Sequence, residues 1–211
     1  MRNSKSAQEG IPVWLRWIAL VWLMFWVVVY ARYWGLANFM HLCDIAVVLS
    51  SLGLWSNNRL LISSQAVASL LADTAWGLDA GWRFFLGRHL VGGTEYLFDA
   101  RFPLWVRLLS LYHLVMPLLL LWALYRVGYD RRGWALQSAI TLPALVGARF
   151  TSPAANVNFV FRDPVFHRAW TPAPAYLAVL FLLMVFVAYF PAHALFKRLF
   201  PYTRQEASKD Y

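Results

Sequence analysis

The chain has 211 residues, of which 61% are hydrophobic and only 14% are charged, and it carries a formal net charge of +9. A soluble domain is charged at roughly a quarter of its residues, so this composition excludes an ordinary water-soluble protein and indicates a bilayer as the solvent. The Lys and Arg residues lie between and beyond apolar runs and form no single basic patch, which argues against a nucleic-acid-binding protein.

Six apolar segments are long enough to cross a bilayer, whose hydrocarbon core is spanned by about 20 mostly apolar residues. We therefore expect an all-α, polytopic membrane protein: a six-transmembrane-helix bundle that forms one domain over residues 12–200. Polar tails precede it at residues 1–11 and follow it at residues 201–211. In chain order, the expected helices are Pro12–Tyr33, Ala37–Trp55, Arg59–Asp79, Pro103–Val127, Gly133–Phe150 and Pro174–Phe196.

The connections between these segments differ in length. Three are short, which predicts that the helices they join pack as antiparallel hairpins; this applies to helices one to three and to helices four and five. The connection at residues 81–102 is longer, and we interpret it as an interfacial segment between helices three and four. The connection at residues 151–174 is rich in proline and predicts no helix.

Charge near the helix ends predicts the orientation. With an even number of helices both termini lie on one side, and that side carries more Lys and Arg than the other. Because cytoplasmic loops carry an excess of Lys and Arg, we expect both termini to be cytoplasmic.

Ionisable side chains inside the expected helices are the strongest candidates for a functional site. They are His41 and Asp44 on the second helix, Asp73 on the third and His113 on the fourth. Such residues are costly in the hydrocarbon core and usually face the bundle interior or a cavity. His41 and Asp44 are three residues apart, so on a helix they share a face. We expect the three helices to build a polar centre. Pairing of Asp73 with Arg149 or a His would be enough to explain Asp73 as a structural residue.

Several kinds of chemistry fit these residues. Cys43, the single cysteine of the chain, supplies a thiol, and a thiol near an imidazole supports nucleophilic acyl transfer to or from an ester. Two His and two Asp residues are also suitable ligands for zinc or iron, but no spacing here is diagnostic and we assign no metal site. A structural role remains open too, because a His in a membrane helix often hydrogen-bonds to another helix and a lone Cys is often a packing residue.

Short motifs in the chain resemble the bacterial YwaF-type family of integral membrane proteins. The family shows a His-Leu-Cys segment, a later His in another helix, and an Asn-Tyr-x-Tyr stretch that ends in Pro; a Trp-Gly-Leu segment at Trp76 is also similar. The resemblance spans Asn38 to Pro164, and the whole chain also resembles uncharacterised bacterial membrane-associated proteins. The matching positions are His41, Leu42, Cys43, His113, Asn158, Phe159, Phe161 and Pro164.

The resemblance implies an activity and a location. A eukaryotic relative of the family is similar to a phospholipid acyltransferase, which moves an acyl chain between lipids through a Cys and a His. This implies Cys43 as the nucleophile and His113 as the base, with His41 and Asn158 as supporting polar groups beside the Asp residues. It also implies the bacterial inner membrane as the location.

We interpret the sequence as that of a membrane-embedded lipid acyltransferase that uses a Cys/His pair and acts on membrane lipids. Two alternatives stay open. One is a non-catalytic accessory subunit that contacts membrane-protein partners in a larger complex. The other is a small transporter in which Asp73 and the His residues relay protons, although the chain has no internal repeat of the kind common in transporters. The sequence carries no motif that identifies a cofactor, and we leave the cofactor unknown.

Overall fold

The structure, a computed structural model, describes residues 10–201, and all the regular elements in that range are helical. The predicted all-α fold class is therefore confirmed. The α-helices are α1 (Val13–Tyr33), α2 (Leu42–Trp55), α3 (Arg59–Leu86), α4 (Leu104–Leu108), α5 (Tyr112–Val127), α6 (Gly133–Ala148), α7 (Ala173–Leu183) and α8 (Phe190–Leu199). Short 3₁₀-helices are η1 (Leu36–Met40), η2 (Glu95–Phe98), η3 (Leu109–Leu111) and η4 (Val157–Phe159), and η5 (Met184–Tyr189) is a π-helix.

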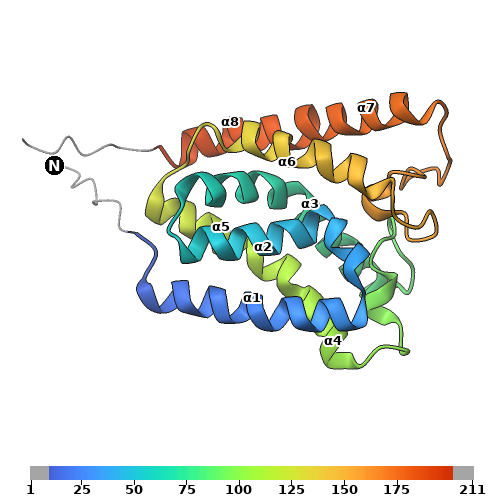
Figure 1. The fold of residues 1–211 in the computed structure, drawn as a ribbon, viewed down its shortest axis with the longest axis horizontal. Helices are drawn as coiled ribbons and strands as arrows, with labels where there is room; N and C mark the ends of the chain where they lie inside the picture. Colours follow the sequence, from blue (N-terminus) through green and yellow to red (C-terminus); the bar gives the residue numbers. More distant parts are fainter. Residues whose placement is uncertain (1–9, 202–211) are drawn as a thin grey trace, which may run out of the picture.

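The helices lie side by side along one long axis (Figure 1). Elements α4, η3 and α5 form one continuous rod, Leu104–Val127, and elements α7, η5 and α8 form another, Ala173–Leu199. These two rods and α1 are each long and apolar enough to cross a membrane. The structure thus supports a membrane protein. Helix α2 is apolar but has only 14 residues, and α3 has 28 residues with a polar, buried face.

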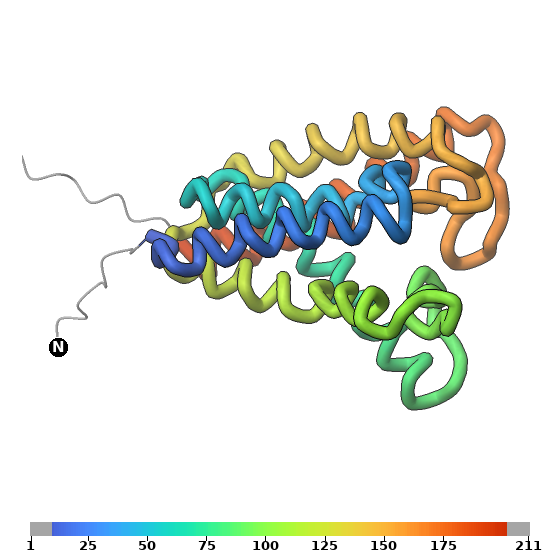
Figure 2. Tube along the Cα trace, turned by 60° about the horizontal axis from the view of Figure 1, so that its bottom comes forward, coloured from blue at the N-terminus to red at the C-terminus, as the bar shows by residue number. Residues whose placement is uncertain are grey.

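The described ends of the chain lie at the same end of the bundle, where α1 begins and α8 finishes (Figures 1 and 2). The connection from α3 to α4 and the connection from α6 to α7 both lie at the opposite end, where they form two separate lobes (Figure 2). Most of the predicted polar tails falls on residues 1–9 and 202–211, outside the described residues.

The second helix begins later than its apolar run predicts. Instead of a helix from Ala37, the chain forms η1, then an extended residue at His41 (φ −63°, ψ 133°), and α2 begins at Leu42. The cause is Asn158, whose side-chain oxygen accepts a hydrogen bond from the Leu42 N–H at 2.9 Å and so provides the start of the helix with a partner. The prediction that His41 and Asp44 share a helical face is therefore wrong, because His41 precedes the helix.

The third helix extends past its expected end at Asp79 to Leu86. No proline or glycine pair interrupts it before Gly87, which takes the left-handed conformation (φ 74°) that ends helices. Helix α3 is the centre of the bundle, since it packs against α2, α5, α6 and η5. Its buried face is made of small and polar residues, which let neighbouring helices approach closely. These residues include Ser63, Ser64, Gln65, Ala66, Ala68, Ser69 and Asp73.

The fourth and fifth expected helices, α5 and α6, were predicted to form a hairpin, but the main neighbour of each is α3. The short link between them is attached to the start of α3. The Asp130 N–H donates to Ser63 Oγ at 2.8 Å, and a Cβ added to Gly133 would lie 2.8 Å from Ser63 Cβ and 2.9 Å from its carbonyl carbon. The glycine therefore permits the close approach of α6 to α3.

Asp163 organises the lobe between α6 and α7. Its carboxylate accepts hydrogen bonds from the backbone N–H groups of Val165, Phe166 and Arg168 and from the Trp170 indole at 2.8 Å. Partial desolvation raises the pKa of Asp163, but these hydrogen bonds outweigh it and lower the pKa to about 2. The lobe is therefore held by an ionised carboxylate.

Replacing Gly133 by Ala should destabilise the fold. The added Cβ meets Ser63 backbone and side-chain atoms closer than van der Waals contact allows, and overpacking of this kind costs about 1–3 kcal/mol. The measurement is thermal or denaturant unfolding of the detergent-solubilised protein. Gly81→Ala in α3 is the matched control, because a Cβ there meets nothing within 4 Å. Equal stability of the two variants would contradict the close contact.

The lobe at Asp163 should lose its hydrogen-bond protection in acid. The folded pKa lies below the ordinary Asp value of about 3.9, so the stabilisation is complete above that value and is lost as the pH falls through about 2. Amide hydrogen exchange of residues 165–168 should accelerate over this range, beyond the intrinsic effect of pH. Asp163→Asn should accelerate it already at neutral pH. Asp99→Asn, which removes an exposed pair with Arg101, is the control and should leave the lobe unchanged.

Candidate functional site

Buried ionisable side chains from three helices meet in one region of the bundle. Asp44 at the start of α2, Asp73 on α3 and His113 on α5 are at most 4% exposed. Side chains of the second, third and fourth expected helices thus meet in one polar cluster. Each of these groups is expensive to bury, so its partners decide what the centre can do.

His113 is paired with Asp73. Its Nδ1 lies 2.7 Å from Asp73 Oδ1, and its ring is stacked between Trp76 and Tyr112, with ring centroids 4.6 and 4.2 Å away. With Asp73 ionised, Nδ1 is the donor and carries the proton in the neutral ring. The two aromatic rings fix the plane of the imidazole. Arg149, the other predicted partner of Asp73, instead donates to the Val160 carbonyl.

Asp44 is held by polar groups from two directions. The Tyr112 hydroxyl donates to its Oδ1 at 3.0 Å, and the Asn38 side-chain N–H donates to its Oδ2 at 2.5 Å. The Cys43 thiol lies 4.0 Å from Oδ1. Tyr112 also stacks on His113, so it joins the two carboxylates into one cluster.

The position of Cys43 follows from the late start of α2. It is the second residue of the helix and is half-buried. Asn158, in a left-handed conformation (φ 51°), accepts from the Leu42 N–H and donates to the Met40 carbonyl at 2.8 Å. Asn158 therefore clamps the chain on both sides of His41, and its support for the site acts through the backbone. The His41 carbonyl accepts from the first N–H groups of α2, at Asp44 and Ile45.

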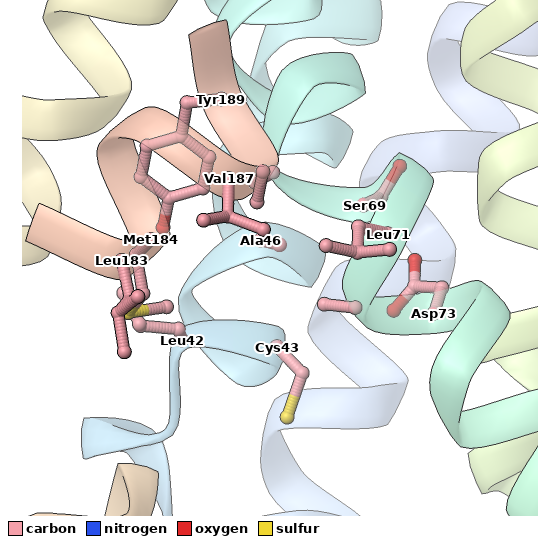
Figure 3. Close-up of a pocket in the computed structure, with 13 residues that line it drawn as sticks. Leu42, Cys43, Ala46, Ser69, Leu71, Asp73, Leu183, Met184, Val187 and Tyr189 are labelled. Atoms are coloured by element: carbon pink, nitrogen blue, oxygen red, sulfur yellow. The ribbon is translucent and has the colours of Figure 1, made fainter. Parts of the chain in front are cut away.

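An apolar pocket of about 340 Å³ adjoins this cluster. It lies between α2, α3 and η5, and both Cys43 and Asp73 line it (Figure 3). Alanine, leucine and methionine side chains make most of the remaining wall. Leu71, Leu183 and Val187 line the pocket and are also exposed on the outer surface of the bundle. The pocket is therefore accessible from the side of the bundle, between α3 and η5.

The predicted catalytic pair of Cys43 and His113 stays a prediction. No hydrogen bond joins the Cys43 thiol and the His113 ring within the described part of the chain, and the pocket is lined by Asp73 and not by His113. His113 lies behind Asp73. The Cys43 thiol instead contacts the Asp44 carboxylate. Residues 10–201 contain no group of three or more His, Cys, Asp or Glu side chains that could hold a metal ion.

Several residues of the site were not predicted. Asn38 and Tyr112 satisfy Asp44, and Trp76 stacks on His113 and donates to the Tyr96 hydroxyl at 3.0 Å. Their positions in the sequence could have indicated two of them. Tyr112 directly precedes His113, and Trp76 is three residues after Asp73, so Trp76 and Asp73 lie on the same side of α3. Tyr189 of η5, which lines the pocket, carried no such signal.

Removing the imidazole should destabilise the bundle through the carboxylate that it leaves behind. His113→Leu removes the partner of Asp73 Oδ1, and a buried acceptor without a partner costs about 1–3 kcal/mol. The double variant Asp73→Leu/His113→Leu should lose less than the sum of the two single losses. Unfolding of all four proteins in detergent gives the coupling energy. Additive losses would show that the two side chains do not interact.

Comparisons with known proteins identify no relative of this chain. No protein-family model matches the chain, and neither a curated protein nor a solved structure matches it. The resemblance to the YwaF-type family thus stays a prediction based on the motif residues.

Proposed function

We propose that this protein is a six-span integral membrane enzyme that transfers acyl chains between lipids through a thioester on Cys43. The observation that carries the proposal is the laterally open apolar pocket, which brings the thiol of Cys43 and the carboxylate of Asp73 to one apolar space. A pocket of this size is at the lower end of the roughly 300–1,000 Å³ found for small-molecule sites. Its apolar wall suits an acyl chain, and its polar end suits the ester.

The placement in the membrane is part of the proposal. Helix α2 alone is about 21 Å long at 1.5 Å per residue, which is less than the ~30 Å hydrocarbon core, so η1 and α2 together form the second span. Helix α3 forms the third span, shielded by its neighbours. Apolar side chains on the outside of α1 support contact with lipid. They include Val13, Trp14, Trp17, Val21, Met24 and Val28.

We further infer that both termini are cytoplasmic and that the membrane is the bacterial inner membrane. The two lobes, at residues 87–103 and 149–172, then lie at the opposite interface. Exposed aromatic residues in and beside the lobes support this position, because aromatic side chains are favoured where lipid meets water. Phe84 and Phe85 precede the first lobe, and Phe150, Phe166 and Trp170 belong to the second.

The thioester would form by addition of the thiol to the ester carbonyl, followed by loss of the alcohol. The Cys43 thiol gives its proton to the Asp44 carboxylate that it contacts, and the thiolate attacks the carbonyl carbon of a lipid ester. The C–O bond of the ester breaks, and the leaving alcohol takes the proton from Asp44. The products are an acyl-thioester on Cys43 and a lipid alcohol, so atoms and charge balance. An acceptor then attacks the thioester and restores the free thiol.

The surroundings of Cys43 support this step. Cys43 lies in the first turn of α2, and the partial positive charge at a helix N-terminus favours the negative charge that develops on the carbonyl oxygen. Tyr112 and Asn38 hold Asp44 in place beside the thiol. His113 is a positioning residue in this scheme, since it fixes Asp73 at the pocket wall.

Cys43→Ser is the direct test. Reconstituted in vesicles of phosphatidylethanolamine and phosphatidylglycerol with labelled acyl chains, the wild-type protein should transfer label between lipids and gain the mass of one acyl group, removable by hydroxylamine. The variant should lose transfer by roughly 10³-fold or more, as expected for loss of a nucleophile. The adduct is assigned unambiguously because the chain has one cysteine.

Ser56→Ala is the matched control. Ser56 follows α2, is exposed, and bonds only within its own turn, so this variant should keep full activity. Wild-type activity in Cys43→Ser would refute the thioester. Absence of both transfer and adduct in the wild-type protein, with the fold intact, would refute acyl transfer itself.

A second candidate function is a small transporter, and one observation favours it. A second buried network runs from the pocket into α6: the Tyr189 and Thr141 hydroxyls lie 2.8 Å apart, Thr141 bonds to Gln137, and the Gln65 side chain donates to Gln137 at 3.2 Å. Gln65 and Asp73 both lie on the buried face of α3. Proton or solute flux into vesicles that persists in Cys43→Ser and disappears in Asp73→Asn would favour this function over acyl transfer.

A further inference from the structure

Two buried polar atoms at the pocket have no partner. Asp73 Oδ2 and Ser69 Oγ are buried and make no hydrogen bond, and both residues line the pocket. They are four residues apart on α3, so they lie one turn apart on the same side of the helix. Their residues are only 2% and 3% exposed. Buried polar groups are nearly always satisfied, so two unsatisfied atoms on residues that line a cavity support a ligand that completes them.

The chemistry of this ligand follows from what the two atoms lack. Asp73 already accepts from His113 through Oδ1, and its Oδ2 needs a donor. Ser69 can donate or accept. Apart from Cys43 and Tyr189, the rest of the pocket wall is apolar. The complementary molecule is therefore an amphiphile with an apolar chain and a polar end that both donates and accepts a hydrogen bond, which is the pattern of a hydroxyl group.

Charge decides between a hydroxyl and an ammonium end. An ammonium group carries its charge into a pocket walled by alanine, leucine and methionine, and desolvation of an ion there is costly. A fatty-acid carboxylate would face the carboxylate of Asp73 and be repelled. A neutral hydroxyl satisfies Oδ2 and Ser69 without either penalty.

We propose that Asp73 and Ser69 bind the hydroxyl group of the acyl acceptor, so the acceptor is an alcohol with a long apolar chain. This inference rests on the proposed function for the role of the site. The hydroxyl gives its proton to Asp73 Oδ2 while its oxygen attacks the carbonyl carbon of the Cys43 thioester. The C–S bond breaks, and the proton passes to the departing sulfur. One ester and one thiol result, with no other reactant.

The test is binding selectivity, measured by native mass spectrometry of the full chain released from nanodiscs. The probes are a long-chain primary alcohol, its methyl ether, the amine and the fatty acid, all of the same chain length. A hydrogen bond to a charged group contributes about 1.5–3 kcal/mol, so the alcohol should bind about 10-fold or more tightly than the ether, which cannot donate. The amine and the acid should bind more weakly than the alcohol.

Asp73→Ala should abolish the preference for alcohol over ether, and Ser69→Ala should reduce it. The preference is a ratio within one variant, so partial loss of folded protein does not change it. Ser50→Ala is the matched control, because Ser50 Oγ is also buried without a partner, on α2, but does not line the pocket. It should keep the preference.

The outcomes separate the two proposals. A preference for alcohol that persists in Cys43→Ser, without any acyl adduct in the wild-type protein, would keep the alcohol-binding site at Asp73 and Ser69 and refute acyl transfer. An acyl adduct without any preference for alcohol would keep acyl transfer and overturn this inference. Tighter binding of the amine than of the alcohol, or an unchanged preference in Asp73→Ala, would also overturn it.

Discussion

The need to satisfy carboxylates buried in an apolar bundle determines how the helices are arranged around α3. Asp73 takes a hydrogen bond from His113 on α5, and Asp44 takes them from Tyr112 on α5 and Asn38 in η1. An unpaired charge in hydrocarbon would cost several kcal/mol, so these bonds fix the positions of α2, α3 and α5 relative to one another. The pocket exists at the edge of this arrangement, where η5 does not close over α3.

Stability and function make different demands on the same groups. Oδ1 of Asp73 is used for structure, through His113, while Oδ2 is left for the pocket. Each oxygen of Asp44 accepts one hydrogen bond, and its Oδ1 also lies 4.0 Å from the Cys43 thiol. Three of the four oxygens of Asp44 and Asp73 accept hydrogen bonds, so both side chains are held in place before any ligand binds.

The apolar runs of the sequence predicted the helices well, since length and composition are local properties. The first expected helix, Pro12–Tyr33, matches α1 to within one residue. Contacts between distant parts of the chain were not predictable: the break at His41 depends on Asn158, more than a hundred residues later. The ionisable members of the site were found because each is anomalous in an apolar run. The pairing of His113 with Asp73, and not with Cys43, depends on packing, which single residues do not reveal.

The order of the partners along the chain constrains how the protein is made. Helix α3 leaves the ribosome before the residues that satisfy it, because His113, Asp130 and Gln137 all lie later in the sequence. Until they arrive, its serines, Gln65 and Asp73 face lipid or water without their final partners. The last of these partners, Gln137, lies 72 positions after Gln65. Insertion of α3 is therefore coupled to synthesis of the chain as far as α6. During biogenesis this helix requires either shelter inside the insertion machinery or a temporary position at the membrane surface.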